Sequence, residues 1–257
     1  MMNYQLNDTG DYLRLSYNLT TQERPTLVFL HDSLGCIELW RDFPQKLGEA
    51  TGCSVLIYDR QGYGQSSPFT EGGRQKDYLA HEADVLNRLL TDLGVSDAVL
   101  FGHSDGGSIA LIAAAKYPTL IKAVITEGGH IFVEDITLTG LKAAVKLYQT
   151  TSLKEKLQKY HGEKTEAVFR AWTETWLDEQ FRDWTITSFL PHIQCPVLVI
   201  QGEKDEYGSM AQVEGIVQHV SGKVEVFIVP DVGHSPHKEN AEATLEKATP
   251  FIETWVS

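Results

Sequence analysis

The residues most able to do chemistry centre on Ser104, in the segment 99–117, which reads VLFGHSDGGSIALIAAAKY. Residues 102–106 match the pattern Gly-x-Ser-x-Gly. In that pattern a serine occupies a strained turn between a strand and a helix, and its hydroxyl projects above the sheet. The glycines let strand and helix pass close together, and the start of the helix offers N–H groups to a negatively charged oxygen. The segment therefore predicts a serine nucleophile.

The same pentapeptide also occurs as an ordinary glycine-rich turn, because glycine and serine are common residues. Here an apolar run, 98–101, precedes the serine, and an alanine-rich stretch of helical character follows it. A strand before the serine and a helix after it are the context that the motif requires. This context favours the nucleophile over the turn.

A serine hydroxyl is a poor nucleophile at neutral pH, so it needs a base within hydrogen-bond reach and an acid that orients the base. Both should follow the carboxyl ends of strands, where ligands bind in open α/β sheets. Of the nine histidines, His234 follows a predicted strand and a short loop, and we expect it to be the base. His237 is its nearest rival, and a surface loop histidine is the simpler alternative for His234. We assign structural roles to His31 and His103, which flank predicted site loops.

The acid should also follow a strand. Asp205 comes after the predicted buried strand 196–201 and before His234, and we expect it to orient the imidazole. Glu127, at the end of the preceding strand, is the second candidate. A solvated turn residue is the alternative interpretation of Asp205. Ser104, Asp205 and His234 then stand in the chain order Ser, Asp, His, one of the known orders of a catalytic triad.

The elements that must position these residues alternate between strand and helix. Strands separated by helices of ten to fifteen residues indicate βαβ units and a mostly parallel sheet with helices on both faces. Residues 3–7 and 12–18 alternate in polarity and predict an antiparallel sheet edge, joined by a turn at 7–10. The remaining predicted strands are 26–30, 54–58, 98–101, 123–126, 196–201 and 225–229, and the predicted helices include 37–50, 78–93, 210–220 and 241–255.

The alternation breaks between about residues 128 and 192, where helical segments rich in large aromatic side chains replace it. We therefore predict a core formed by residues 1–129 and 193–257, with a helical cap at 130–192 inserted between two strands. One helical face in the insertion carries an apolar stripe that either packs onto the main body or lines a pocket. The stripe consists of Val168, Trp172, Trp176 and Leu177.

Composition limits the class of partner. The chain has 257 residues, 42% hydrophobic and 22% charged, which suits one large globular domain with an insertion. Its net charge of −13 argues against nucleic acid and anionic membrane as partners, since both require clustered Lys and Arg. We expect a small-molecule substrate, and the oligomeric state stays open.

The remaining bulk signals concern metals and location. The cysteines, Cys36, Cys53 and Cys195, are scattered without C-x-x-C spacing, so neither a disulfide framework nor a zinc site is predicted, and we expect no metal or cofactor. The first residues do not read as a signal peptide, and no apolar run approaches the ~20 residues of a membrane span. A cytoplasmic location is the expectation.

Nearly the whole chain resembles the α/β-hydrolase superfamily. The segments GHSDGGSIALIAAAKYP, LPHIQCPVLVIQGEKD and GHSPH are similar to those of its valacyclovir hydrolase (biphenyl hydrolase-like) group. The resemblance implies the α/β-hydrolase fold, with a mostly parallel eight-stranded sheet, helices on both faces and a helical cap. It also implies a cofactor-free serine hydrolase that cleaves small carboxylic esters through an acyl-enzyme, with α-amino-acid esters as the substrates of that group.

The resemblance also assigns site residues. In that group the aspartate after the nucleophile binds the substrate's ammonium group, and the matching residue is Asp105, although an acidic residue in the first turn of a helix is also favoured by the helix dipole alone. We expect the N–H groups of Ser33, or of Leu34 one place on, and of Asp105 to form the oxyanion hole, with Leu34 also contacting substrate. The chain departs from the family pattern at Asp32, where many relatives have glycine, and at Gln61, where they commonly have arginine.

Two other functions fit the same residues. The same triad and cap serve hydrolases that cleave carbon–carbon bonds in vinylogous diketones. A ligand-binding protein built on the hydrolase scaffold is the alternative from a different class. The sequence leaves the acyl and alcohol groups of the substrate open.

Overall fold

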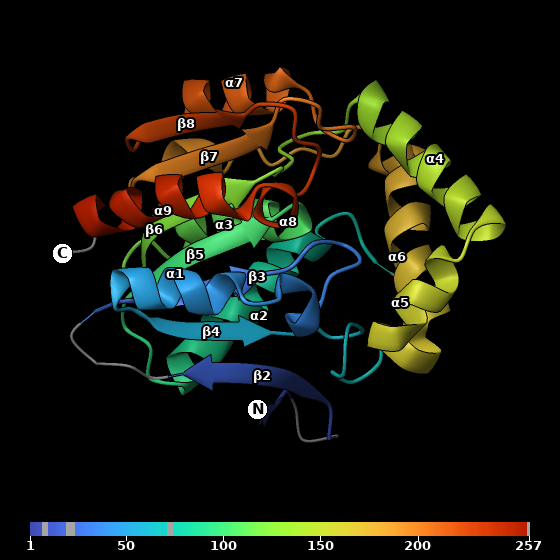
Figure 1. Cartoon of the computed structure of the whole chain (residues 1–257), viewed down its shortest axis with the longest axis horizontal. Coiled ribbons are helices and arrows are strands. Elements are labelled where there is room, and N and C mark those ends of the chain that lie inside the picture. Colours follow the sequence, from blue (N-terminus) through green and yellow to red (C-terminus); the bar gives the residue numbers. More distant parts are fainter. Residues whose placement is uncertain (7–9, 19–23, 71–73, 256–257) are drawn as a thin grey trace.

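The strands form one sheet, and Figure 1 shows it with helices packed on both sides. The computed structural model describes residues 1–6, 10–18, 24–70 and 74–255. Over these residues the sheet has eight strands in the order β1-β2-β4-β3-β5-β6-β7-β8. β1 pairs antiparallel with β2 and β2 with β4, whereas the pairs from β4 to β8 are parallel. The strands are β1 (Met2–Gln5), β2 (Tyr12–Asn18), β3 (Thr26–Leu30), β4 (Ser54–Tyr58), β5 (Ala98–His103), β6 (Ile121–Glu127), β7 (Val197–Gly202) and β8 (Val224–Val229).

This sheet confirms the predicted mostly parallel, eight-stranded architecture, including its antiparallel edge. The turn predicted between the first two strands falls largely on residues 7–9, outside the described residues. The helices outside the segment between β6 and β7 are α1 (Phe43–Thr51), α2 (Tyr78–Asp92), α3 (Asp105–Lys116), α7 (Met210–His219), α8 (Pro236–Glu239) and α9 (Ala241–Trp255), with a short 3₁₀ helix at η1 (Ile37–Trp40). Another 3₁₀ helix, η4 (Leu190–His192), lies at the end of the segment between β6 and β7.

The sheet buries both of its faces because successive side chains of a strand point to opposite sides. In β3, Leu27 and Phe29 pack into the core under α1 and α9, and Val28 and Leu30 pack into the core under α2 and α3. All five residues of β3 are buried, which explains why the sequence shows a continuous apolar run there. Helices on both faces were predicted, and the two cores confirm them.

The predicted helix 37–50 is wrong as one element. The structure has a short 3₁₀ helix, η1, and then α1, separated at Arg41, whose φ is 55°. Pro44 lies in the first turn of α1, where its missing N–H costs nothing and its fixed φ suits the start of a helix. Pro44 was therefore the sequence signal for the break.

The segment between β6 and β7 is helical, and in Figure 1 it stands beside the sheet, beyond the arrowheads of β4 and β5. It contains α4 (Asp135–Thr150), α5 (Leu153–His161) and α6 (Thr165–Leu177), together with the 3₁₀ helices η2 (Gly162–Lys164) and η3 (Glu179–Phe181). His161 Nε2 donates to the Leu34 carbonyl at 3.0 Å, which ties α5 to the loop after β3. The inserted helices therefore cover the edge of the sheet where the predicted site residues stand.

Among the described residues, no helix is both long and apolar enough to cross a membrane. The three cysteines are free, with Cys36 and Cys53 buried and Cys195 half-buried.

Candidate active site

Ser104 occupies the turn that joins β5 to α3. Its backbone adopts φ 54° and ψ −118°, a conformation that a non-glycine residue holds at a cost of about 1–3 kcal/mol. The turn is possible because its flanks lack side chains: a Cβ on Gly102 would lie 2.1 Å from the Gly106 carbonyl oxygen, and one on Gly106 would lie 1.9 Å from the Leu30 carbonyl oxygen. The two glycines therefore let β3, β5 and α3 come close together at Ser104.

The predicted oxyanion donors lie on the two segments that meet here. Asp105 is the first residue of α3, so its N–H is one of the four that have no partner within the helix. The Leu34 N–H points to the Asp32 carboxylate, 3.4 Å away, and the Gly35 N–H donates to the Asp32 carbonyl at 3.2 Å. The Ser33 N–H donates to no other described residue, so it is the better candidate of the two loop donors.

Asp32, which stands where many relatives have glycine, does not need a left-handed backbone, because the described non-glycine residues with positive φ are Arg41, Ser104 and Asp231. Its carboxylate lies 3.7 Å from His103 Nδ1 and lines the same cavity as Ser104. Burial raises the pKa of this carboxyl, but Lys238 and the neighbouring histidines lower it more, and the net pKa lies well below the usual value. The substitution therefore adds a negative charge to the site.

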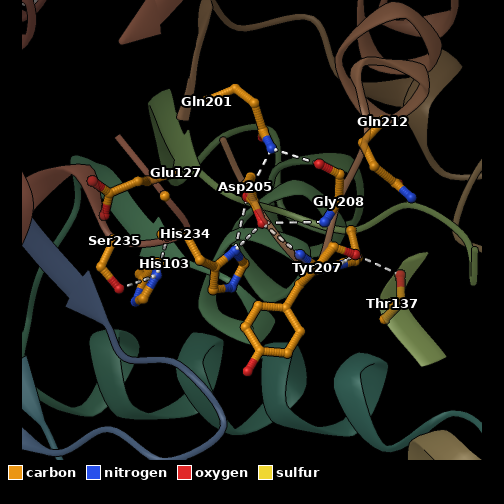
Figure 2. A network of polar contacts seen from close by, with 12 residues as sticks. His103, Glu127, Thr137, Gln201, Asp205, Tyr207, Gly208, Gln212, His234 and Ser235 are labelled. Atoms are coloured by element: carbon orange, nitrogen blue, oxygen red, sulfur yellow. Dashed lines mark hydrogen bonds and ion pairs between the residues drawn. The ribbon is translucent and has the colours of Figure 1, made fainter. Parts of the chain in front are cut away.

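Asp205 and His234 form a direct pair, as Figure 2 shows. His234 Nδ1 lies 2.9 Å and 2.8 Å from the two carboxylate oxygens of Asp205. The carboxylate also accepts from Gln201 Nε2 at 2.7 Å and from the Tyr207 and Gly208 N–H groups at 2.8 Å and 3.2 Å. Five contacts thus hold the acid in place, and the imidazole takes its orientation from it.

The pair also sets the charges of its members. Burial raises the pKa of the Asp205 carboxyl, but His234 and the Tyr207 N–H lower it more, and it falls to about 2. Burial lowers the pKa of the His234 imidazole, but the Asp205 carboxylate raises it more, so the net pKa lies above the usual 6.5. Asp205 is therefore a carboxylate at neutral pH, and it stabilises a proton on His234.

Ser104 and His234 line one cavity of about 160 Å³. Because Nδ1 of His234 faces Asp205, Nε2 is the ring nitrogen left for the serine hydroxyl. No hydrogen bond between described residues joins Ser104 Oγ to that nitrogen in this structure. Such bonds are often long without substrate and shorten when it binds. The structure thus places Ser104 and His234 on one cavity, with Asp205 on the other side of the imidazole.

The second candidates, Glu127 and His237, pair with each other rather than with the predicted acid and base. Glu127 accepts from both the N–H and Nδ1 of His237, and both side chains are buried. Burial lowers the pKa of His237, so the pair is a neutral imidazole donating to a carboxylate. The Glu127 carbonyl accepts from the Ser104 N–H at 2.8 Å, so this pair links the serine turn to the histidine loop.

Among the described residues, two groups of side chains could reach a shared metal ion: His103, Glu127 and His237 form one, and Cys36, Glu38 and Asp59 form the other. In the first group the Glu127 oxygens are already used by His237, and His103 Nε2 contacts the His234 carbonyl at 2.9 Å. Figure 2 shows His103 beside Ser235 and His234. The group is thus a hydrogen-bonded support for the histidine loop.

The two carboxylate oxygens of Asp105 have different surroundings. Its side chain is buried, and its Oδ2 accepts from the Tyr78 hydroxyl at 3.0 Å and lies 3.7 Å from Arg60 Nη2. Its Oδ1 accepts no hydrogen bond from the described residues, and the residue lines the cavity. One carboxylate oxygen is therefore held by the protein, and the other is left for a ligand.

The remaining predicted contacts also reach the cavity. Leu34 lines it and packs against a small apolar cluster formed by Tyr148 of α4, Leu157 of α5 and Phe169 of α6. Of the apolar stripe on α6, Trp172 and Trp176 line the cavity, whereas Val168 is buried in the interior. The stripe both packs onto the body and lines the pocket, so each of the two interpretations holds for part of it.

Sequence reasoning missed Tyr207, two residues after the acid. The centre of its ring lies 4.9 Å from the centre of the His234 ring. The ring also packs against α4, where a Cβ on Gly140 would come within 2.8 Å of it. Figure 2 shows its hydroxyl on the far side from Asp205. Burial and nearby carboxylates raise the pKa of its phenol to about 12, so it stays a donor at neutral pH. Nothing local in the sequence marks a tyrosine at this position.

Comparisons with known proteins agree with this architecture. A family model described as the alpha/beta hydrolase fold matches residues 25–189. Serine hydrolase BPHL of Homo sapiens is 29% identical, over 94% of this chain and 84% of that protein. A 2-hydroxy-6-oxononadienedioate/2-hydroxy-6-oxononatrienedioate hydrolase of Klebsiella pneumoniae is 24% identical, over 96% and 93%. A crystal structure from work on carboxylesterases of Nitrososphaera gargenis superposes with a TM-score of 0.81 at 17% identity, over 98% of each chain.

Proposed function

This chain belongs to the alpha/beta hydrolase fold family, and we propose that it is a serine hydrolase that cleaves small carboxylic esters through an acyl-enzyme. The observation that carries the proposal is the Asp205–His234 pair, whose imidazole lines the same cavity as Ser104 in its strained turn. An ionised acid, an imidazole oriented by it and a serine hydroxyl at the start of a helix are the groups that acyl transfer requires. The similarity to serine hydrolase BPHL along most of the chain supports the same class of reaction.

In the proposed reaction, Ser104 Oγ attacks the ester carbonyl while His234 Nε2 takes its proton. The negative charge on the tetrahedral oxygen is stabilised by the N–H groups of Ser33 and Asp105. The imidazolium then gives the proton to the leaving alcohol, and the acyl group stays on Ser104. Water, deprotonated by the same imidazole, releases the acid and restores the serine. Asp205 stays ionised throughout and stabilises the charged ring.

The cavity favours a small substrate that is not an anion. Its volume, about 160 Å³, is below the ~300–1,000 Å³ typical of sites for drug-sized ligands. Its lining includes three carboxylate residues, Asp32, Asp105 and Glu206, and no Lys or Arg among the described residues. A carbon–carbon hydrolase of dicarboxylate substrates is the second candidate, supported by the relative from Klebsiella pneumoniae, but the acidic lining would repel such a substrate.

The free oxygen of Asp105 fits an ammonium group on the substrate. A carboxylate next to the nucleophile would pair with a cation on the carbon beside the scissile carbonyl, and charge-assisted hydrogen bonds are the strong ones. We therefore include α-amino-acid esters among the proposed substrates, with Asp105 as the residue that binds their ammonium group.

Changing Asp105→Asn should separate this role from a role in the helix dipole. The variant keeps the residue 105 N–H and the side-chain shape but loses the charge. We expect kcat/KM for an α-amino-acid ester to fall about 10²-fold, which corresponds to the ~2–3 kcal/mol of a charged hydrogen bond. A neutral ester of the same size serves as the control in the same variant and should change by less than about threefold. Equal losses on both esters would remove the ammonium-binding role.

The proposed function itself is tested by combining covalent labelling with turnover. A fluorophosphonate should label one residue, Ser104, because the reagent needs an activated hydroxyl and an oxyanion hole. Peptide mapping identifies the labelled residue, and a panel of neutral, anionic and α-amino esters measures multiple turnover. We expect turnover to be highest on the α-amino and neutral esters. Labelling without turnover of any ester would favour a binding protein, and faster cleavage of a vinylogous diketone would favour the carbon–carbon hydrolase.

A further inference from the structure

Arg60 is a fully buried arginine whose contacts the proposed reaction does not yet explain. It is the second residue after β4, and its side chain is 0% exposed. The hydrogen bonds that the structure gives its guanidinium leave from Nη2 and end on the carbonyls of His31, at 3.3 Å, and Asp32, at 3.0 Å. Its backbone N–H also donates to His31 Nε2 at 3.1 Å. Arg60 thus holds the two residues that directly precede Ser33.

The same nitrogen faces the other half of the predicted oxyanion hole. Arg60 Nη2 lies 3.7 Å from Asp105 Oδ2, which Tyr78 also binds. The two halves are in direct contact elsewhere, since a Cβ on Gly106 would meet the Leu30 carbonyl at 1.9 Å. One guanidinium therefore bridges the loop after β3 and the first residue of α3, on which the two predicted donors lie.

The rest of the guanidinium is packed rather than hydrogen-bonded within the part of the chain that the structure describes. Its Nε and Nη1 are buried without a hydrogen bond among the described residues, and its Cζ lies 4.6 Å from the centre of the Tyr63 ring. The aromatic face stabilises the cation without directing it. Buried polar groups usually form hydrogen bonds, so two unpaired guanidinium nitrogens need an explanation. The position that the contacts of Nη2 give to the side chain is that explanation.

We propose that Arg60 is a positioning residue that sets the spacing between the Ser33 and Asp105 N–H groups of the oxyanion hole. The inference rests on the proposed function, since it concerns how that site stabilises the tetrahedral oxygen. One cationic nitrogen, Nη2, contacts both carbonyls and the carboxylate, so a single side chain ties the two backbone segments together. Arg60 therefore acts on the reaction through the two backbone segments and does not touch the substrate.

The test compares Arg60→Met and Arg60→Lys with Arg74→Met on a neutral ester, where an ammonium contact plays no part. Arg74 is the matched control because it also stacks on Tyr63 and loses the same charge, yet its hydrogen bonds go to Tyr63 and the Ala171 carbonyl. For Arg60→Met we expect kcat to fall about 10²-fold, the scale of a misplaced oxyanion donor, with KM changed by less than about threefold. Arg60→Lys should recover part of kcat, and Arg74→Met should resemble the unmodified protein.

Further measurements distinguish a positioning role of Arg60 from a purely structural one. The pH at which activity falls on the acid side should stay unchanged in the Arg60 variants, because the Asp205–His234 pair is intact, and fluorophosphonate labelling should slow in parallel with kcat. If Arg60→Met does not fold, the double variant Arg60→Met/Asp105→Asn is compared with Asp105→Asn alone. The double variant leaves no unpaired buried carboxylate, and the comparison measures the same loss of kcat. An Arg60 variant that folds with the kcat of Arg74→Met would overturn the inference and leave the proposed function intact. Retained turnover in Ser104→Ala would instead overturn the proposed function.

Discussion

Replacing Ser104 by alanine should reduce kcat by about 10⁵- to 10⁶-fold on any ester that the protein hydrolyses. Without the hydroxyl no acyl-enzyme can form, and the remaining rate comes from the oxyanion hole acting on water, which is worth about 10³- to 10⁴-fold over the uncatalysed reaction. KM should change little, because the methyl group of alanine leaves the cavity open and its other walls intact. Initial rates with a chromogenic ester, together with loss of fluorophosphonate labelling, measure the effect.

The matched control is Ser108→Ala, one turn further along α3. Its hydroxyl is buried like that of Ser104 but donates to the His130 carbonyl at 2.6 Å. This variant loses both hydrogen bonds of the Ser108 hydroxyl to the His130 backbone, so it should lower stability by about 1–3 kcal/mol and keep most of its turnover. Near-normal ester hydrolysis by Ser104→Ala would show that another group is the nucleophile.

Replacing Asp205 by asparagine should lower kcat by about 10⁴-fold, because the amide no longer holds the imidazole in the tautomer that accepts a proton at Nε2. The pH dependence adds a second readout. The base works only when its ring is neutral, so in the unmodified protein kcat/KM should fall as the pH drops through the raised pKa of His234. Loss of the Asp205 charge removes what raises this pKa, so the acid limb of the variant should move to lower pH while its maximum falls.

Glu127→Gln is the control for this experiment, since Glu127 serves His237 in the same way that Asp205 serves His234. It should destabilise the fold but leave the acid limb where it is. If instead Glu127→Gln moves the limb and Asp205→Asn does not, the acid and base would have to be reassigned to Glu127 and His237. Measuring kcat/KM from about pH 5 to pH 9 in all three proteins decides the matter.

The sheet and the serine turn were predictable because their signals are local. A buried parallel strand shows itself as a continuous apolar run, as in 26–30, and the turn at Ser104 needs two glycines within five residues. The structure adds the reason that those glycines cannot be replaced, which is the contact of Gly106 with the end of β3. The predicted helix 37–50 was wrong as one element because the chain turns at Arg41 and a new helix starts at Pro44, a residue that suits the first turn of a helix.

The pairing of acids and bases depended on the tertiary structure. The sequence offers two acids at the ends of strands, Glu127 and Asp205, and two histidines in one loop, His234 and His237. Their places after strands favour Asp205 with His234, but spacing alone leaves Glu127 and His237 as rivals. The short helix α8 begins at Pro236, so His237 lies buried against β6, whereas His234 precedes the helix and meets the end of β7. The same holds for Arg60 and Tyr207, whose partners are distant in the chain.

By itself, then, the sequence determined the sheet, the serine turn and the set of chemical groups, because each depends on residues within a few positions of one another. The sequence favoured Asp205 and His234 from their places after strands, and the tertiary structure paired Glu127 with His237, left the Ser33 N–H without a partner among the described residues and placed the buried guanidinium. The physical reason is range: sterics and periodicity act between chain neighbours, whereas hydrogen-bond partners are set by packing among residues as far apart as His103 and His234, which are 131 positions apart.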